Sequence, residues 1–134
     1  MNSRISNRLL LIAIVWACGW MPQTAQAEDL SGWWTGHWES CTTGHRGPLR
    51  GHFCRQADGS YQVRFSGRFF KIVPFRYTTT LDVVSEGDTV VLSGDSYLGR
   101  LMGTFHYRAT ASGGHFQASY SSRKDHGLFV LQRQ

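Results

Sequence analysis

The chain has 134 residues, a formal net charge of +5, 41% hydrophobic residues and 13% aromatic residues. This length accommodates a single domain. The aromatic content excludes a disordered chain. Glycine is frequent but has no three-residue period, and no heptad pattern is sustained, so collagen-like and coiled-coil chains are excluded as well.

Residues 1–27 have the pattern of a secretory signal peptide. Arg4 and Arg8 precede an apolar run over residues 9–20, and Ala25-Gln26-Ala27 is a small-x-small cleavage site. The run is shorter than the roughly 20 residues that a spanning helix needs. We therefore expect an exported protein of the periplasm or the extracellular space, and not an integral membrane protein.

A second interpretation of this segment is lipidation, because Val15-Trp16-Ala17-Cys18 loosely resembles a bacterial lipobox, in which Cys18 would carry the anchor. Under the first interpretation, residues 28–134 form one domain of 107 residues with 12 basic and 9 acidic residues. This balance is only mildly basic, and together with export it argues against a nucleic-acid partner.

Two cysteines, Cys41 and Cys54, remain after residue 27. An isolated pair in an oxidising compartment is most simply a disulfide, and the bridge would close a loop worth about 3 kcal/mol in the chain-entropy model. His45 and His52 lie between the two, so a metal site is an alternative, although the spacing matches no familiar zinc pattern. Two free thiols are a third possibility. We expect no metal and no cofactor.

From residue 28 onward the chain alternates polar and apolar residues with a period of two and is interrupted by turn residues every 8–14 positions, a pattern typical of short antiparallel strands. No stretch has helical periodicity with caps. The predicted fold is all-β, an eight-stranded antiparallel up-and-down β-barrel, which hides both the apolar face and the strand edges. A β-sandwich is the alternative. The predicted strands cover residues 32–41, 49–57, 60–73, 75–85, 88–94, 99–110, 114–122 and 127–133.

The alternation places a set of large aromatic residues on the inward face. They could form the apolar wall of a pocket for a small hydrophobic ligand, or they could fill the core together with interleaved glycines. Leu101 and Gly103 also fall on the inward face. The candidate ligand-binding residues are Trp34, Trp38, Phe53, Phe65, Phe69, Tyr77, Phe105 and Tyr107.

Basic residues cluster on the outward face between positions 46 and 76. A three-residue turn around Asp58-Gly59 would pair residues whose numbers sum to 118, so that Phe53 faces Phe65 and Arg50 faces Arg68. Directly opposed like charges are mildly destabilising, and an anionic partner such as an envelope component would relieve this cost. We therefore expect an anion-binding surface at Arg50, Arg64 and Arg68, with a solvated charged face as the alternative.

The segment Leu30-Ser31-Gly32-Trp33-Trp34 resembles the start of lipocalin and calycin barrels, in which a Gly-x-Trp lies on the first strand. The resemblance implies that Trp34, following Gly32, packs across the closed end of a barrel. The same segment, the two cysteines and the length also look like the periplasmic metalloprotease inhibitors, which block a secreted protease with their N-terminal segment. In this chain that segment is Glu28–Leu30.

A longer likeness involves Thr43–Leu49, Gly67–Phe70 and Lys124–Gly127, which are similar to a group of short secreted planctomycete proteins. This likeness implies an origin and no activity.

We find no pattern that predicts catalysis. Asp125-His126 falls where a hairpin turn is expected, and the sequence has no carboxylate pair on the inward face and no phosphate-binding loop. We therefore expect a binding protein and not an enzyme. A protease inhibitor is one alternative. A structural envelope protein is another, forming a homo-oligomer through outward apolar residues such as Trp33, Phe70, Ile72 and Phe129.

Overall fold

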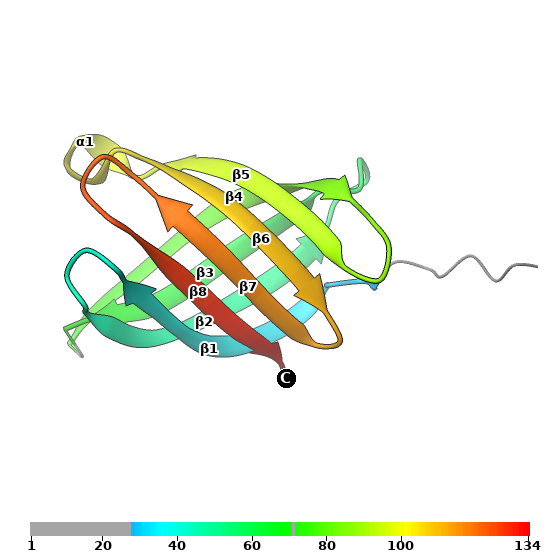
Figure 1. Ribbon diagram of the computed structural model, residues 1–134, viewed down its shortest axis with the longest axis horizontal. Helices are drawn as coiled ribbons and strands as arrows, with labels where there is room; N and C mark the ends of the chain where they lie inside the picture. Colours follow the sequence, from blue (N-terminus) through cyan, green and yellow to red (C-terminus); the bar gives the residue numbers. More distant parts are fainter. Residues whose placement is uncertain (1–27, 71) are drawn as a thin grey trace, which may run out of the picture.

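The computed structural model describes residues 28–70 and 72–134, which form a closed antiparallel barrel in which each strand pairs with the next and β8 returns to β1 (Figure 1). The predicted up-and-down barrel is therefore confirmed. The predicted signal peptide and Cys18 lie outside the described residues. The strands are β1 (Gly32–Ser40), β2 (Arg46–Arg55), β3 (Tyr61–Phe69), β4 (Val73–Ser85), β5 (Val90–Tyr97), β6 (Thr104–Ser112), β7 (His115–Ser121) and β8 (His126–Arg133).

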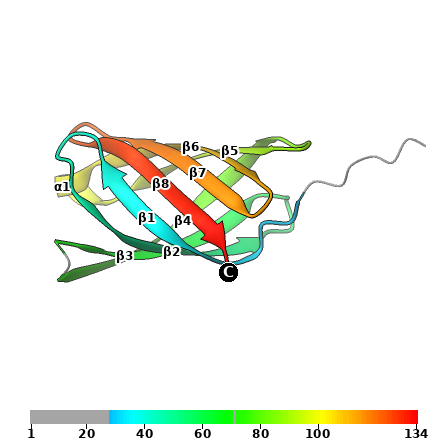
Figure 2. The ribbon, with the colours of Figure 1, turned by 60° about the horizontal axis from the view of Figure 1, so that its bottom comes forward.

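The two ends of the barrel differ in character. One end, here called the closed end, carries residues 28–31 and the connections 56–60, 86–89 and 113–114. The other, here called the loop end, carries the connections 41–45, 70–72, 98–103 and 122–125. At the loop end the β3–β4 hairpin is splayed away from the other strands (Figure 2). A single-turn helix, α1 (Gly99–Met102), lies at the same end (Figure 1).

The interior is packed with aromatic and aliphatic side chains. Trp34 and Phe53 lie next to each other with ring centroids 5.5 Å apart, and Phe53 meets Phe116 edge-on at 5.2 Å. Phe65 and Phe129 continue the row toward the loop end, with centroids 5.2 Å apart. Edge-to-face contacts of this kind add to the burial of ring area. The core is therefore a continuous aromatic stack along the barrel axis.

Closure of the barrel depends on the absence of a side chain at two positions of the β1–β8 seam. A Cβ atom at Gly36 would lie 1.8 Å from the carbonyl oxygen of Val130, and one at Gly127 would lie 2.0 Å from that of Glu39. These distances are far below van der Waals contact, so no larger residue fits unless the strands separate. The two glycines let the first and last strands approach closely enough to join.

The observed β2–β3 register differs from the predicted one. Leu49 faces Gly67 and Phe53 faces Val63, so paired residues sum to 116 and not to 118. The turn is formed by residues 57–59, because Asp58 accepts hydrogen bonds from the backbone and hydroxyl of Ser60 and Gly59 has a positive φ of 88°. The predicted turn was one residue too late.

This shift also changes the predicted pairing of glycine with glycine. Gly51 faces Phe65, and the Phe65 ring lies over the space that the glycine leaves. The same shift places Ser66, and not Arg68, opposite Arg50. The predicted direct opposition of the two arginines is therefore wrong.

Two further predictions on inward residues are corrected. The sixth strand begins at Thr104 and not at residue 99, because residues 99–102 form α1, and Leu101 is exposed. Phe129, expected on the outside, is buried because its partners Trp38 and Ala118 both face the core. The other three residues expected on the outside, Trp33, Phe70 and Ile72, are exposed.

The predicted disulfide between Cys41 and Cys54 is wrong, since both are free, exposed thiols. Cys41 lies in the β1–β2 turn at the loop end, whereas Cys54 lies near the end of β2 and pairs with Gln62. About ten strand residues separate the two levels of the barrel, or roughly 30 Å. A disulfide requires Cα atoms within about 7 Å.

Candidate functional site

All eight of the predicted ligand-binding residues face the interior, where they form one cluster. Six are buried, and Phe69 and Tyr77 are partly buried and pack against the same core. The space left between them is small. A cavity of about 40 Å³ lies near the loop end, bordered by Trp38, Phe69, Tyr77, Phe105 and other residues. Ligand pockets usually measure about 300–1,000 Å³, so this cavity is of the size that holds water.

Tyrosine hydroxyl groups supply the polar atoms of this interior. The hydroxyl of Tyr107 donates to that of Tyr77 at 3.0 Å, and the hydroxyl of Tyr120 donates to the Asp125 carboxylate at 3.0 Å. Burial is the largest cause that raises the pKa of each of the three phenols. The pKa of Tyr77 is raised well above its usual value. The three groups therefore remain protonated donors over the ordinary pH range.

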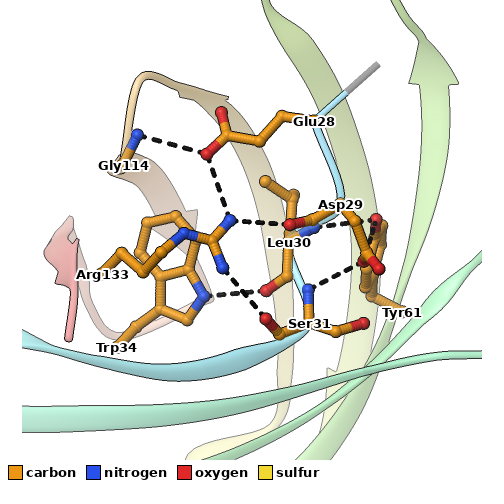
Figure 3. Close-up of polar contacts among 8 residues, drawn as sticks. All are labelled: Glu28, Asp29, Leu30, Ser31, Trp34, Tyr61, Gly114 and Arg133. Carbon is orange, nitrogen blue, oxygen red and sulfur yellow. Dashed lines mark hydrogen bonds and ion pairs between the residues drawn. The ribbon is translucent and has the colours of Figure 1, made fainter. Parts of the chain in front are cut away.

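At the closed end the N-terminal segment is tied across the barrel (Figure 3). The Trp34 indole donates to the carbonyl oxygen of Leu30 at 2.8 Å, and both residues are fully buried. The Leu30 amide donates to the Tyr61 hydroxyl at 3.1 Å. Trp34 thus packs across the closed end of the barrel beneath the N-terminal segment.

Arg133 of β8 lies over the Trp34 ring and also holds the N-terminal segment (Figure 3). Its guanidinium carbon lies 4.6 Å from the Trp34 ring centroid. It donates to the carbonyl oxygens of Ser31 at 3.0 Å and Asp29 at 2.7 Å, and it pairs with the Glu28 carboxylate at 3.1 Å. Residues 28–30, proposed by resemblance to act on a protease, are bound to their own barrel here.

Asp29 completes this closed-end network. A hydrogen bond from the backbone amide of Ser31 at 3.0 Å is the main cause that lowers the pKa of its carboxyl group. Burial raises the pKa of the neighbouring Tyr61 phenol. The contacts of Glu28, Asp29 and Arg133 at this end therefore fasten the N-terminal segment to the barrel.

A larger concave surface lies on the outside of β2, β3 and β4. It measures about 740 Å³ and is here called the arginine groove. The strand register arranges its side chains in two rows across the three strands. The residues lining the groove are Pro48, Arg50, Ser66, Gly67, Arg68, Pro74, Phe75 and Arg76.

The first row of the groove consists of Arg50, Ser66 and Arg76, which face one another directly on adjacent strands. Strands are about 4.8 Å apart, so the two arginines flank the serine hydroxyl across about 10 Å. Arg68 lies one outward position along β3 from Ser66. Three arginines and one serine thus line the same groove, and no acidic residue lines it.

Two contacts from outside the groove involve its arginines, one through the Arg50 side chain and one through the Arg68 backbone. The guanidinium of Arg50 lies over the exposed Trp33 ring, 5.0 Å from the centroid, and such cation–π contact restrains a long side chain. The indole of Trp38 in the core donates to the carbonyl oxygen of Arg68 at 3.1 Å. Among the described residues, Arg50, Arg68 and Arg76 form no salt bridge with an acidic residue.

The groove contains two of the three residues predicted for the anionic surface. Arg50 and Arg68 line it, but Arg64 faces His52 and Thr78 and borders a separate, smaller depression of about 60 Å³. Arg76 was missed, because the predicted cluster was built on the β2–β3 pairing alone. The outward parity of Arg76 on the following strand was the signal that could have identified it.

The structure also places the remaining residues that the sequence singled out as candidates for catalysis or metal binding. The Asp125 carboxylate accepts hydrogen bonds from the hydroxyl groups of Ser40 and Tyr120, which fixes the β7–β8 turn. Cys54 lies beside His52, with the sulfur 3.6 Å from Nδ1. In the described part of the chain, no three histidine, cysteine or acidic residues are grouped as a metal site requires.

Over residues 28–70 and 72–134, no helix is long and apolar enough to cross a membrane. No family model matches the chain, and no curated protein and no solved structure is significantly similar to it.

Proposed function

We propose that the protein is an exported, non-enzymatic binding protein and that it holds a ligand bearing phosphate or a similar oxyanion in the arginine groove. The observation that carries the proposal is that Arg50, Arg68 and Arg76 line one groove together with Ser66, and no acidic residue lines it. Three positive charges in one groove without an acidic residue raise the local positive potential, which carries a cost in the absence of a counter-ion. A bound anion converts this cost into attraction.

The chemistry of the groove favours an oxyanion over a lone halide. Each guanidinium presents a planar fork of donors that matches two oxygens of a phosphate group, and a serine hydroxyl can donate to a third oxygen. The open shape of the groove suits the end group of a larger molecule.

The test is a calorimetric titration of the purified protein with inorganic pyrophosphate at low ionic strength. We expect saturable binding that weakens as salt is added. Arg68→Gln and Arg76→Gln should each lower the affinity about fivefold or more, since an exposed charge-assisted contact contributes about 1 kcal/mol.

Two matched variants serve as controls for this titration. Arg64→Gln removes an arginine of the same strand outside the groove, and Arg108→Gln removes an exposed arginine of β6. Neither should change the affinity. Equal losses in all four variants would show that only net charge matters and would refute a built site.

The small hydrophobic ligand predicted from the aromatic residues remains a second candidate that the interior volume disfavours. A cavity of about 40 Å³ must expand at least severalfold to admit such a ligand. Export rests on the pattern of residues 1–27 and is part of the same proposal. The protease-inhibitor and homo-oligomer interpretations remain predictions from the sequence.

A further inference from the structure

We propose that the loop end of the barrel docks on an anionic lipid bilayer, with Phe70, Ile72 and Leu101 entering the headgroup region and the arginine groove holding lipid phosphates. The proposal rests on the proposed function, because it identifies the ligand of the same groove. It adds a second set of residues, which makes contact with lipid and not with a soluble anion.

The first supporting observation is where the exposed apolar side chains lie. The described residues include seven large hydrophobic side chains that are exposed, and five of them belong to the loop end. Only Trp33 and Val84 lie elsewhere. Scattered exposed apolar residues are normal, but a concentration at one end indicates a contact surface. The five are Phe70, Ile72, Val73, Tyr97 and Leu101.

These side chains lie on two projections of the loop end. The β3–β4 hairpin carries Phe70, 66% exposed, and Ile72, 81% exposed, and it stands apart from the other connections of this end (Figure 2). The segment around α1 carries Leu101, 74% exposed. Leu98 and Met102 of this segment pack inward against the core, which holds Leu101 outward. Two apolar projections at one end suit a planar layer better than a narrow cleft.

The backbone at Phe70 is a second and independent observation. Phe70 is the single non-glycine residue with positive φ among those described, at 51°. A bulky residue is unfavourable in this region, and such strain is found where function requires a side chain in a particular place. Glycine would be the expected residue in a hairpin that only needed to turn. The strained turn instead holds a largely exposed phenyl ring, whose one aromatic contact among the described residues is edge-on with His45 at 4.9 Å.

Charge is distributed unequally between the two ends. The loop end and the adjoining strand ends carry six described basic residues: Arg46, Arg68, Arg76, Arg100, Arg123 and Lys124. The acidic residues there are engaged, since Glu39 pairs with Arg46, Asp95 contacts His106, and Asp125 accepts hydroxyl groups.

The closed end has the opposite character, with Glu28, Asp29, Asp58, Asp82, Glu86 and Asp88 against Arg55 and Arg133. A molecule polarised in this way orients its basic end toward an anionic plane. Each basic residue close to an anionic bilayer adds about fivefold to binding. Apolar side chains surrounded by arginines are the combination that interfacial membrane proteins use, whereas a nucleic acid would leave the apolar projections without a partner.

The experiment is co-sedimentation of the purified protein with vesicles of equal parts phosphatidylglycerol and phosphatidylcholine, and with vesicles of phosphatidylcholine alone. Phe70→Gly combined with Ile72→Ser removes the apolar tip. Val84→Ser is the matched control, because Val84 is an exposed apolar residue of the closed end. Residues 1–27 are common to all variants, so differences between variants report on the barrel.

We expect the wild type to bind the anionic vesicles and the double variant to bind them at least tenfold more weakly, with Val84→Ser unchanged. Phe70→Gly should not impair folding, since glycine adopts the observed φ without strain. Circular dichroism verifies this point. Failure of the wild type to sediment with anionic vesicles, or equal sedimentation of wild type and double variant, would overturn the proposal.

A parallel titration with pyrophosphate separates the two proposals. The double variant should bind pyrophosphate as the wild type does. Pyrophosphate binding without vesicle binding refutes bilayer docking and leaves the anion groove in place. Vesicle binding that depends on Phe70 but is unaffected by Arg68→Gln and Arg76→Gln, with no pyrophosphate binding, refutes the groove.

Discussion

Substitution of Arg133 by methionine should loosen the closed end of the barrel. Methionine retains an unbranched side chain beside the Trp34 ring but removes the guanidinium that holds residues 28–31. Two hydrogen bonds to carbonyl oxygens contribute about 1 kcal/mol each, the partly exposed pair with Glu28 up to about 0.5 kcal/mol, and the cation–π contact about 0.5 kcal/mol. The expected loss is about 3 kcal/mol.

Urea unfolding followed by circular dichroism and tryptophan fluorescence measures this loss. Thermal unfolding gives a second measure. At about 4 °C per kcal/mol for a domain of this size, the melting temperature should fall by about 12 °C. Arg108→Met is the control, because Arg108 is exposed and its side chain contacts no acidic residue among those described; it should change the stability by less than about 0.5 kcal/mol. A loss below about 1 kcal/mol at Arg133, or equal losses at both positions, would refute this account of the closed end.

Three other predictions concern the seam, the interior and the thiols. Gly36→Ala should destabilise the barrel by more than about 3 kcal/mol, since its methyl group would overlap the β8 backbone, and a near-normal unfolding curve would contradict this. Burial raises the pKa values of Tyr77 and Tyr107 in the folded state, so the unfolded state loses protons first and the free energy of unfolding should fall as the pH rises above about 10. Tyr77→Phe should make this fall less steep when urea unfolding is measured at a series of alkaline pH values. An equally steep fall in the variant would count against the mechanism. Cys41 and Cys54 should both react with a thiol reagent in the native protein without reductant, and a disulfide-linked peptide in a digest would contradict the free thiols.

The period-two alternation predicted the fold because it is a direct consequence of strand geometry. Phe65 of β3 has the inward residues Val63 and Gly67 two positions before and after it, and this alternation holds whichever neighbour the strand pairs with. Turn residues then located the eight strands. The eight aromatic residues predicted on the inward face all lie there because parity alone decides the face.

Register is not determined by parity, and this explains the errors at the candidate site. A turn placed one residue too late changes every cross-strand partner by two positions but leaves each residue on its own face. Arg50 was therefore assigned to the correct face but to the wrong neighbour. The arginine groove depends on neighbours across three strands, so Arg76 could not be recognised from the β2–β3 pair alone.

The disulfide was predicted from an isolated pair of cysteines in an oxidising compartment, which does not determine the level of each cysteine along the barrel. Residues 13 positions apart are near each other in a compact loop but lie at opposite ends of a barrel strand. The helix α1 was missed for a different reason. It has four residues, none of them buried, so it leaves no periodic signal in the sequence.

The most direct test of an anion site in the arginine groove is to map the amide resonances of the isotopically labelled protein by nuclear magnetic resonance while pyrophosphate is added. The account predicts that the largest saturable shifts occur at Ser66, Gly67, Arg68 and Arg76, with small shifts at Arg64 and at the closed end. Shifts of equal size around all basic residues, or no saturable shift in the groove, would contradict it.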